Sequence, residues 1–130
     1  MRRSRKLVPA LFCALMLVLL AGCGLVRSFQ IGEAARMTLT SGATGETVEL
    51  TNPEAIRAVT DNIESIRFQR CRSSGNSTGW SYAIRWYDAG GAVLEDMVIQ
   101  SSGMINVDGW FWGAASGGVD TALLEELLEE

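Results

Sequence analysis

The chain has 130 residues and a formal net charge of −4, a size that fits one globular domain. It contains no histidine, so histidine-based catalytic triads, Cys–His nucleophilic pairs and histidine-ligated zinc or haem sites are excluded. No cofactor-binding or metal-binding motif is recognisable, and Gly113–Gly118 lacks the residues of a phosphate-binding loop. We therefore expect a protein that is not an enzyme and needs no cofactor.

The first residues have the charged-then-apolar order of an export signal. Four basic residues come first: Arg2, Arg3, Arg5 and Lys6. The apolar run of residues 7–21 is shorter than the about 20 residues that a transmembrane helix needs, so an uncleaved anchor is the second choice. A soluble secreted protein is the third, because no clear Ala-x-Ala cleavage site is present.

The run ends in Leu20-Ala21-Gly22-Cys23, which resembles the lipobox of bacterial lipoproteins. The resemblance implies cleavage between Gly22 and Cys23 and a diacylglyceryl group on the thiol of Cys23. Two acyl chains hold a protein on a membrane far better than one. We expect residues 1–22 to be a signal peptide, residues 23–32 a lipidated tether, and residues 33–130 an extracytoplasmic domain at the cell membrane.

Removal of residues 1–22 would take away four of the eleven basic residues and no acidic ones, leaving a formal charge of −8. Such a charge disfavours binding to nucleic acid, and also a polybasic grip on anionic lipid. Cys13 would leave with the signal peptide and Cys23 would be acylated. Cys71 would remain as a single thiol, so no internal disulfide is expected.

Alternating polar and apolar residues predict a first hairpin, from 36–40 and 46–51. Asn52-Pro53 then indicates the start of a helix. Its apolar residues recur at helical spacing and predict one buried stripe: Ile56, Val59, Ile63 and Ile66. A strand through Phe68 and Arg70 and a polar loop at 71–79 follow.

The second half predicts further strands in succession. Their ranges are 80–87, 92–100, 104–107 and 110–112. A flexible connection at Gly113–Gly118 leads to a final helix that Asp120 caps, with leucines on one side. The expected fold is α+β: a mainly antiparallel meander of five to seven strands, one helix after the first hairpin and one at the C-terminus.

Aromatic side chains gather in the second half of the chain and suggest a candidate binding face. It consists of Trp80, Trp86, Trp110 and Trp112, with Arg70 and Arg72 beside them. Aromatic rings can stack on sugars or peptides, but they also fill cores and pair across strands, and core packing is the favoured interpretation of these residues.

The remaining polar residues favour ordinary surface roles. Arg85 could join Arg67, Arg70 and Arg72 in an anion site, or pair with acids such as Glu95 and Asp96. These two adjacent acids should point to opposite faces of a strand and make a poor acid–base pair. Cys71 could be a reactive thiol, but without a histidine only arginine could lower its pKa, so a structural or adventitious cysteine is favoured.

Several short motifs together resemble a known family. They are Thr78-Gly79-Trp80-Ser81-Tyr82, Trp86-Tyr87-Asp88-Ala89-Gly90-Gly91, Asp108-Gly109-Trp110-Phe111-Trp112 and Asp120-Thr121-Ala122-Leu123-Leu124. The chain is similar in these to small uncharacterised lipoproteins of Gram-positive bacteria. The resemblance implies a lipid-anchored α+β domain and carries no catalytic residues.

The expected function is that of a non-enzymatic binding or interaction module, held near its partner by the lipid. One alternative is an accessory subunit or inhibitor of another envelope protein. The other is a histidine-free envelope enzyme.

Overall fold

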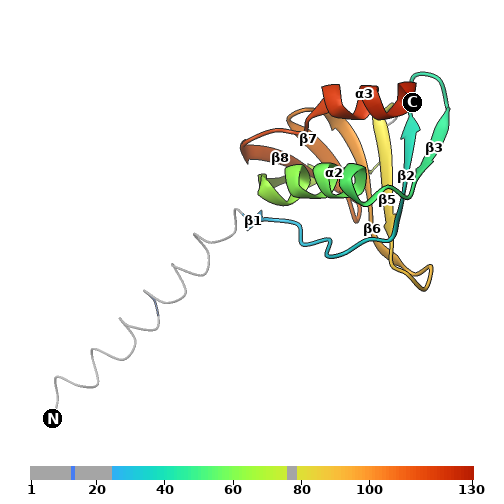
Figure 1. Cartoon of the computed structure of the whole chain (residues 1–130). Helices are drawn as coiled ribbons and strands as arrows, with labels where there is room; N and C mark the ends of the chain where they lie inside the picture. Colours follow the sequence, from blue (N-terminus) through green and yellow to red (C-terminus); the bar gives the residue numbers. More distant parts are fainter. Residues whose placement is uncertain (1–12, 14–24, 76–78) are drawn as a thin grey trace, which may run out of the picture.

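The computed structural model describes residue 13 and residues 25–75 and 79–130. Within these residues, one antiparallel sheet of eight strands carries two helices on one face (Figure 1). The strands are β1 (Val26–Arg27), β2 (Arg36–Ser41), β3 (Thr47–Leu50), β4 (Arg67–Ser73), β5 (Tyr82–Tyr87), β6 (Val93–Ser101), β7 (Met104–Val107) and β8 (Trp110–Ser116). The helices are α2 (Pro53–Ser65) and α3 (Thr121–Glu129). The predicted α+β class, with a mainly antiparallel sheet, is confirmed.

The strand order is β1-β4-β8-β7-β6-β5-β2-β3, so only part of the sheet is a meander. Strands β5 to β8 follow one another as predicted, and Asp108 and Gly109 form the β7–β8 turn with positive φ values of 54° and 79°. The simple meander is wrong because β4 pairs with β8, while the β2–β3 hairpin pairs with β5. Alternation along a strand predicts its buried face and does not specify its neighbour.

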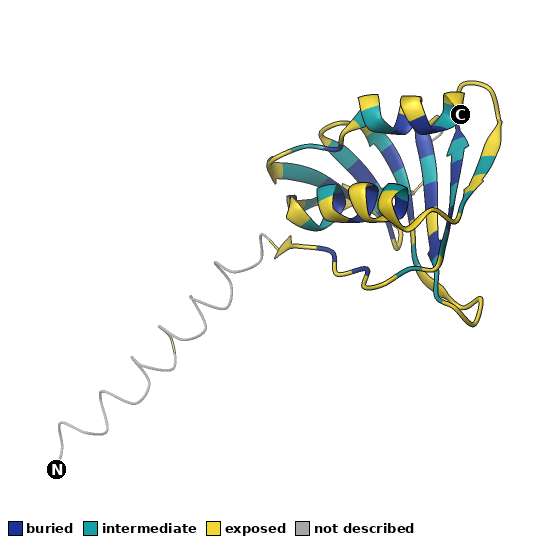
Figure 2. Ribbon diagram, viewed as in Figure 1, coloured by how far each residue is buried: buried dark blue, intermediate teal, exposed yellow. Residues whose placement is uncertain are grey.

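Both helices bury the face that their spacing predicted. Asn52 Oδ1 accepts a hydrogen bond from the Glu54 N–H at 2.9 Å and caps α2. Asp120 Oδ1 accepts from the Leu123 N–H at 3.1 Å and caps α3. The buried sides of both helices pack against the sheet and form the core with it (Figure 2). Their core residues are Ile56, Val59, Ile63, Leu124 and Leu127.

The segment before β2 is part of this core. It runs beneath α2 from the β1 side of the sheet to β2 (Figure 1). Phe29 is fully buried, Ile31 is 4% exposed, and the Ala35 N–H donates to the Tyr87 carbonyl at 2.9 Å. Residues 23–32 were expected to be a tether, but β1, Phe29 and Ile31 pack against the domain. Their apolar side chains lack a regular period because the segment has almost no regular secondary structure.

Three strands begin or end at other residues than predicted. β4 extends to Ser73, into the loop expected from Cys71. β5 begins at Tyr82 rather than Trp80. β8 continues to Ser116, so the first part of the expected flexible connection Gly113–Gly118 is strand. β4 and β8 are longer than predicted because they pair with each other, and this pairing supplies hydrogen bonds that local composition does not reveal.

Candidate functional site

The four tryptophans of the candidate binding face separate into two pairs. Trp86 is fully buried, and its Nε1 donates to Thr60 Oγ1 on α2 at 3.1 Å. Trp112 is 6% exposed, and its Nε1 donates to the Val107 carbonyl at 3.4 Å. Trp80 and Trp110 are 41% and 37% exposed. Trp86 and Trp112 are therefore core residues, and the four rings do not form one binding face.

Trp80 lies outside the strands. It passes so close to the turn of the β2–β3 hairpin that a Cβ at Gly42 would lie 2.0 Å from the Trp80 carbonyl oxygen. Trp110, at the start of β8, is paired with Val107 and Ser73. Of the two exposed rings, only Trp110 stacks against Arg70 or Arg72.

Strands β1 and β4 carry a series of arginines, which we call the arginine edge: Arg27, Arg67, Arg70 and Arg72. The Arg70 guanidinium lies 4.3 Å from the centre of the Trp110 ring. Arg72 lies 5.2 Å from Phe111 in the same way. A guanidinium over an aromatic face is attracted by the ring quadrupole and keeps its N–H donors at the rim.

Arg27 extends this arrangement onto β1. Its guanidinium lies 4.3 Å from the Phe29 ring and 5.8 Å from that of Trp112. Phe29 in turn makes edge-on contacts with Phe68 and Trp112, with ring centres 5.6 Å apart in each pair. Arg70 and Arg72 were predicted from the sequence. Arg27 and Phe29 were not, because both lie in the segment expected to be a tether.

The arginine edge has two sides. Arg70 is opposite Trp112 in the β4–β8 register, whereas Arg72 is opposite Phe111, which lies outside the main core. Residues directly opposite one another share a face of a sheet, so Arg70 and Arg72 lie on opposite faces. Cys71, at the bulge between them, is exposed, and its Sγ is 3.4 Å from the Gln69 carbonyl oxygen.

The charge of Arg27 also acts on Glu95, a carboxylate on β6. Burial raises the pKa of Glu95, and the charge of Asp108 adds to that effect, while the positive charge of Arg27 opposes it. The strands β1 and β4 themselves carry four arginines and no acidic residue, so this edge is basic within an acidic domain.

Arg85 does not join the arginine edge. Its Nη2 lies 2.8 Å from Asp96 Oδ2, which makes Asp96 the partner that the sequence suggested. The hydrogen bond from Arg85 to Asp96 raises the pKa of Arg85 above its usual value. Glu95 is opposite Trp86 and Asp96 opposite Arg85, so the adjacent acids lie on opposite faces as expected.

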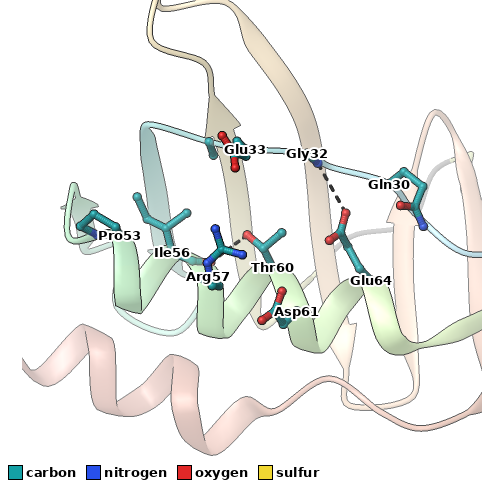
Figure 3. A pocket seen from close by; sticks show the side chains of 10 residues that line it. Gln30, Gly32, Glu33, Pro53, Ile56, Arg57, Thr60, Asp61 and Glu64 are labelled. Atoms are coloured by element: carbon teal, nitrogen blue, oxygen red, sulfur yellow. Dashed lines mark hydrogen bonds between the residues drawn. The ribbon is translucent and has the colours of Figure 1, made fainter.

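A hollow of about 450 Å³ lies between α2 and the irregular segment that leads from β1 to β2 (Figure 3). Its charged lining residues are Glu33, Arg57, Asp61 and Glu64. Glu64 Oε2 accepts hydrogen bonds from the N–H groups of Ile31 at 2.8 Å and Gly32 at 3.4 Å, so this carboxylate mainly holds the segment in place. This hollow could not be predicted from sequence patterns, because one of its walls is that irregular segment.

In the described part of the chain, no group of three or more acidic, cysteine or histidine side chains is arranged to hold a metal ion. Nor does any helix among residues 25–75 and 79–130 have the length and apolar character to cross a membrane. Gly22 and Cys23, the predicted cleavage and lipidation residues, lie outside the described residues. Comparison with protein-family models, with curated proteins and with solved structures finds no match to this chain.

Proposed function

We propose that this protein is an extracytoplasmic lipoprotein, anchored by a lipid on Cys23, whose α+β domain is a non-enzymatic binding or interaction module. The lipobox-like residues ending at Cys23 support the proposed export and membrane location. No catalytic residue is assigned.

The observation that carries the proposal is how soon after Cys23 the folded domain begins. The Leu25 carbonyl accepts a hydrogen bond from the Arg70 N–H at 2.9 Å, and Phe29 is fully buried. Two residues of extended chain span at most about 7 Å. A lipid on Cys23 would therefore hold the domain against the membrane surface and raise its concentration near other envelope components.

The second candidate, an accessory subunit or inhibitor of another envelope protein, is favoured by the free edge of β3. β3 is the last strand on its side of the sheet, and Thr47 and Glu49 are exposed. An open edge strand can accept a strand of another protein by backbone hydrogen bonding.

The anchor is tested by expressing the full chain and its Cys23→Ala variant in a bacterium that processes lipoproteins. We expect the natural chain to be shortened by residues 1–22, to gain the mass of a diacylglyceryl group and to fractionate with membranes. Cys23→Ala should remain unprocessed and unlipidated, whereas Cys71→Ala, the matched cysteine control, should behave like the natural chain. Unchanged processing and membrane retention in Cys23→Ala would contradict the proposal.

The binding role is tested by crosslinking the lipidated protein in intact cells and identifying what is captured. A reproducible envelope component lost on addition of excess purified protein supports an interaction module, and Glu49→Pro in β3 should abolish capture if the accessory-subunit function holds. Turnover of a substrate by the purified protein, lost on replacing one carboxylate, would overturn the non-enzymatic assignment.

A further inference from the structure

We propose that the arginine edge docks on the anionic headgroups of the membrane that holds the Cys23 lipid, so that the domain stands on its β1–β4 side. The inference rests on the proposed anchor and names the surface that this edge contacts. It revises the expectation that an acidic domain makes no basic contact with lipid, because that expectation used the net charge alone.

The distribution of charge is the first argument. Four of the seven arginines that follow Cys23 lie on β1 and β4, and neither strand carries an acidic residue. Acids are grouped on α3, which carries Glu125, Glu126 and Glu129 and contacts β2 and β3 on the other side of the sheet. Near an anionic surface, such a dipolar domain turns its basic edge inward and its acidic parts outward.

The reach of the anchor is the second argument. β1 is the outermost strand on the basic side of the sheet, and Leu25 is bonded to Arg70. Only Gly24 separates Cys23 from Leu25, so the lipid would be attached at the arginine edge itself. At about 7 Å of extended chain, the distance is within the Debye length of about 8 Å at physiological salt.

The third argument is the apolar character of the same edge. Leu25 and Val26 are each 46% exposed, and Trp110 is 37% exposed beneath Arg70. Tryptophan favours the boundary between headgroups and acyl chains, where the apolar part of its ring contacts lipid and its N–H group can bind water or headgroups. Arginines stacked on rings keep N–H donors free for phosphate oxygens. Apolar, aromatic and cationic groups thus meet at one place, as membrane-surface contacts require.

Cys71 offers a probe at this edge. Once Cys13 leaves with the signal peptide and Cys23 is acylated, Cys71 is the one reactive thiol, and it is exposed between Arg70 and Arg72. We would label it with bimane and reconstitute the lipidated protein into vesicles of phosphatidylcholine, with or without phosphatidylglycerol, containing brominated lipid as quencher. The control is the variant C71S/E49C, labelled on β3 at the opposite edge of the sheet.

We expect strong quenching of the Cys71 label in phosphatidylglycerol vesicles, much weaker quenching in phosphatidylcholine, and little quenching of the β3 label in either. Replacing Arg27, Arg70 and Arg72 with Gln should lower the docking equilibrium constant about a hundredfold. Lys at the same positions should largely preserve docking. Arg36→Gln, which removes an arginine stacked on Tyr87 at 3.8 Å and lies off this edge, is the matched control.

Equal quenching of the two labels, or quenching unaffected by phosphatidylglycerol, would overturn the docking surface. If the Gln variant fails to fold by circular dichroism, a salt titration of the natural protein decides: docking must weaken as salt rises. Mass spectrometry of each preparation separates the two proposals. A missing lipid on Cys23 contradicts the anchor, whereas a lipid that is present with an unquenched Cys71 label contradicts docking alone.

Discussion

The two edges of the sheet end in different ways. At one edge, β4 is covered by the two-residue β1, and the following segment inserts Phe29 and Ile31 into the core. At the other edge, β3 is a four-residue strand with exposed Thr47 and Glu49, and no strand of the described chain lies beyond it. The first edge is therefore covered by the chain itself, whereas the second leaves the outer backbone groups of β3 without a strand partner in the described chain.

The two sides of the sheet also differ in charge and in the helix that they contact. The β1–β4 edge carries arginines stacked on rings, whereas the β2–β3 side carries Glu46 and Glu49 and contacts the acidic helix α3. One small domain therefore has a basic side beside the predicted anchor and an acidic side away from it. Net charge alone conceals this, because it sums over positions that the fold separates.

Phe29→Ala should have the largest effect on this comparison. Phe29 is fully buried between Phe68 and Trp112, and its loss should lower the free energy of unfolding by about 3–5 kcal/mol. Urea unfolding measures the change. Leu25→Ala, at a side chain 46% exposed, should change stability by about 0.5 kcal/mol or less. Equally small losses in both variants would mean that the segment is a tether that does not stabilise the core.

Glu64→Ala should have the next largest effect, on the same side of the molecule. Removing the carboxylate leaves the partly buried Ile31 N–H without its 2.8 Å acceptor, at a cost of about 1–2 kcal/mol. Glu64→Gln retains an acceptor oxygen and should cost less than half of that. Hydrogen exchange at the Ile31 amide should accelerate in Glu64→Ala alone, and unchanged exchange would argue against this contact.

The fate of individual residues shows what the sequence could predict. Period-2 alternation placed Tyr82, Ile84 and Trp86 together, and all three are buried. The capping roles of Asn52 and Asp120 were also predictable, because they depend on a few adjacent residues. Such local signals gave both helices and most of the strands.

The arginine edge required information that local patterns lack. Arg70 and Arg72 meet Trp110 and Phe111 only because β4 pairs with β8, some forty residues further along the chain. Phe29 is buried by a segment without a period, so neither helix nor strand spacing could indicate it. The sequence therefore indicated some residues of the arginine edge but not the residues that they contact.

The pKa of Tyr82 predicts how the stability of the acidic side depends on pH. The Tyr82 hydroxyl donates a hydrogen bond to Glu125 Oε1 on α3. The pKa of Tyr82 is raised from 10.0 to about 12, mainly by burial and further by the hydrogen bond to Glu125 and its negative charge. The unfolded chain loses this proton near its ordinary pKa of 10.0, so the stabilisation is complete below that pH and is lost as pH rises toward about 12.

Urea midpoints measured from about pH 9 upward should therefore fall through this range. In Tyr82→Phe that part of the decline should be absent, and stability near neutral pH should drop by about 1 kcal/mol as the hydrogen bond is lost. Parallel pH profiles for the two proteins would show that Tyr82 stays as easily ionised in the folded domain as in the unfolded chain.

Glu49→Gln should have the smallest effect, and it sharpens the contrast between the edges. Glu49 Oε1 lies 3.8 Å from Arg36 Nε, and the two side chains are 57% and 35% exposed, so water screens their attraction. Exposed pairs of this kind contribute from nothing to about 1 kcal/mol, and we expect less than about 0.5 here. Arg36 also stacks on Tyr87 at 3.8 Å, a contact that Glu49→Gln leaves in place. A loss approaching that of Glu64→Ala, in the same urea experiment, would mean that β3 is held by its charges rather than by its hairpin pairing with β2.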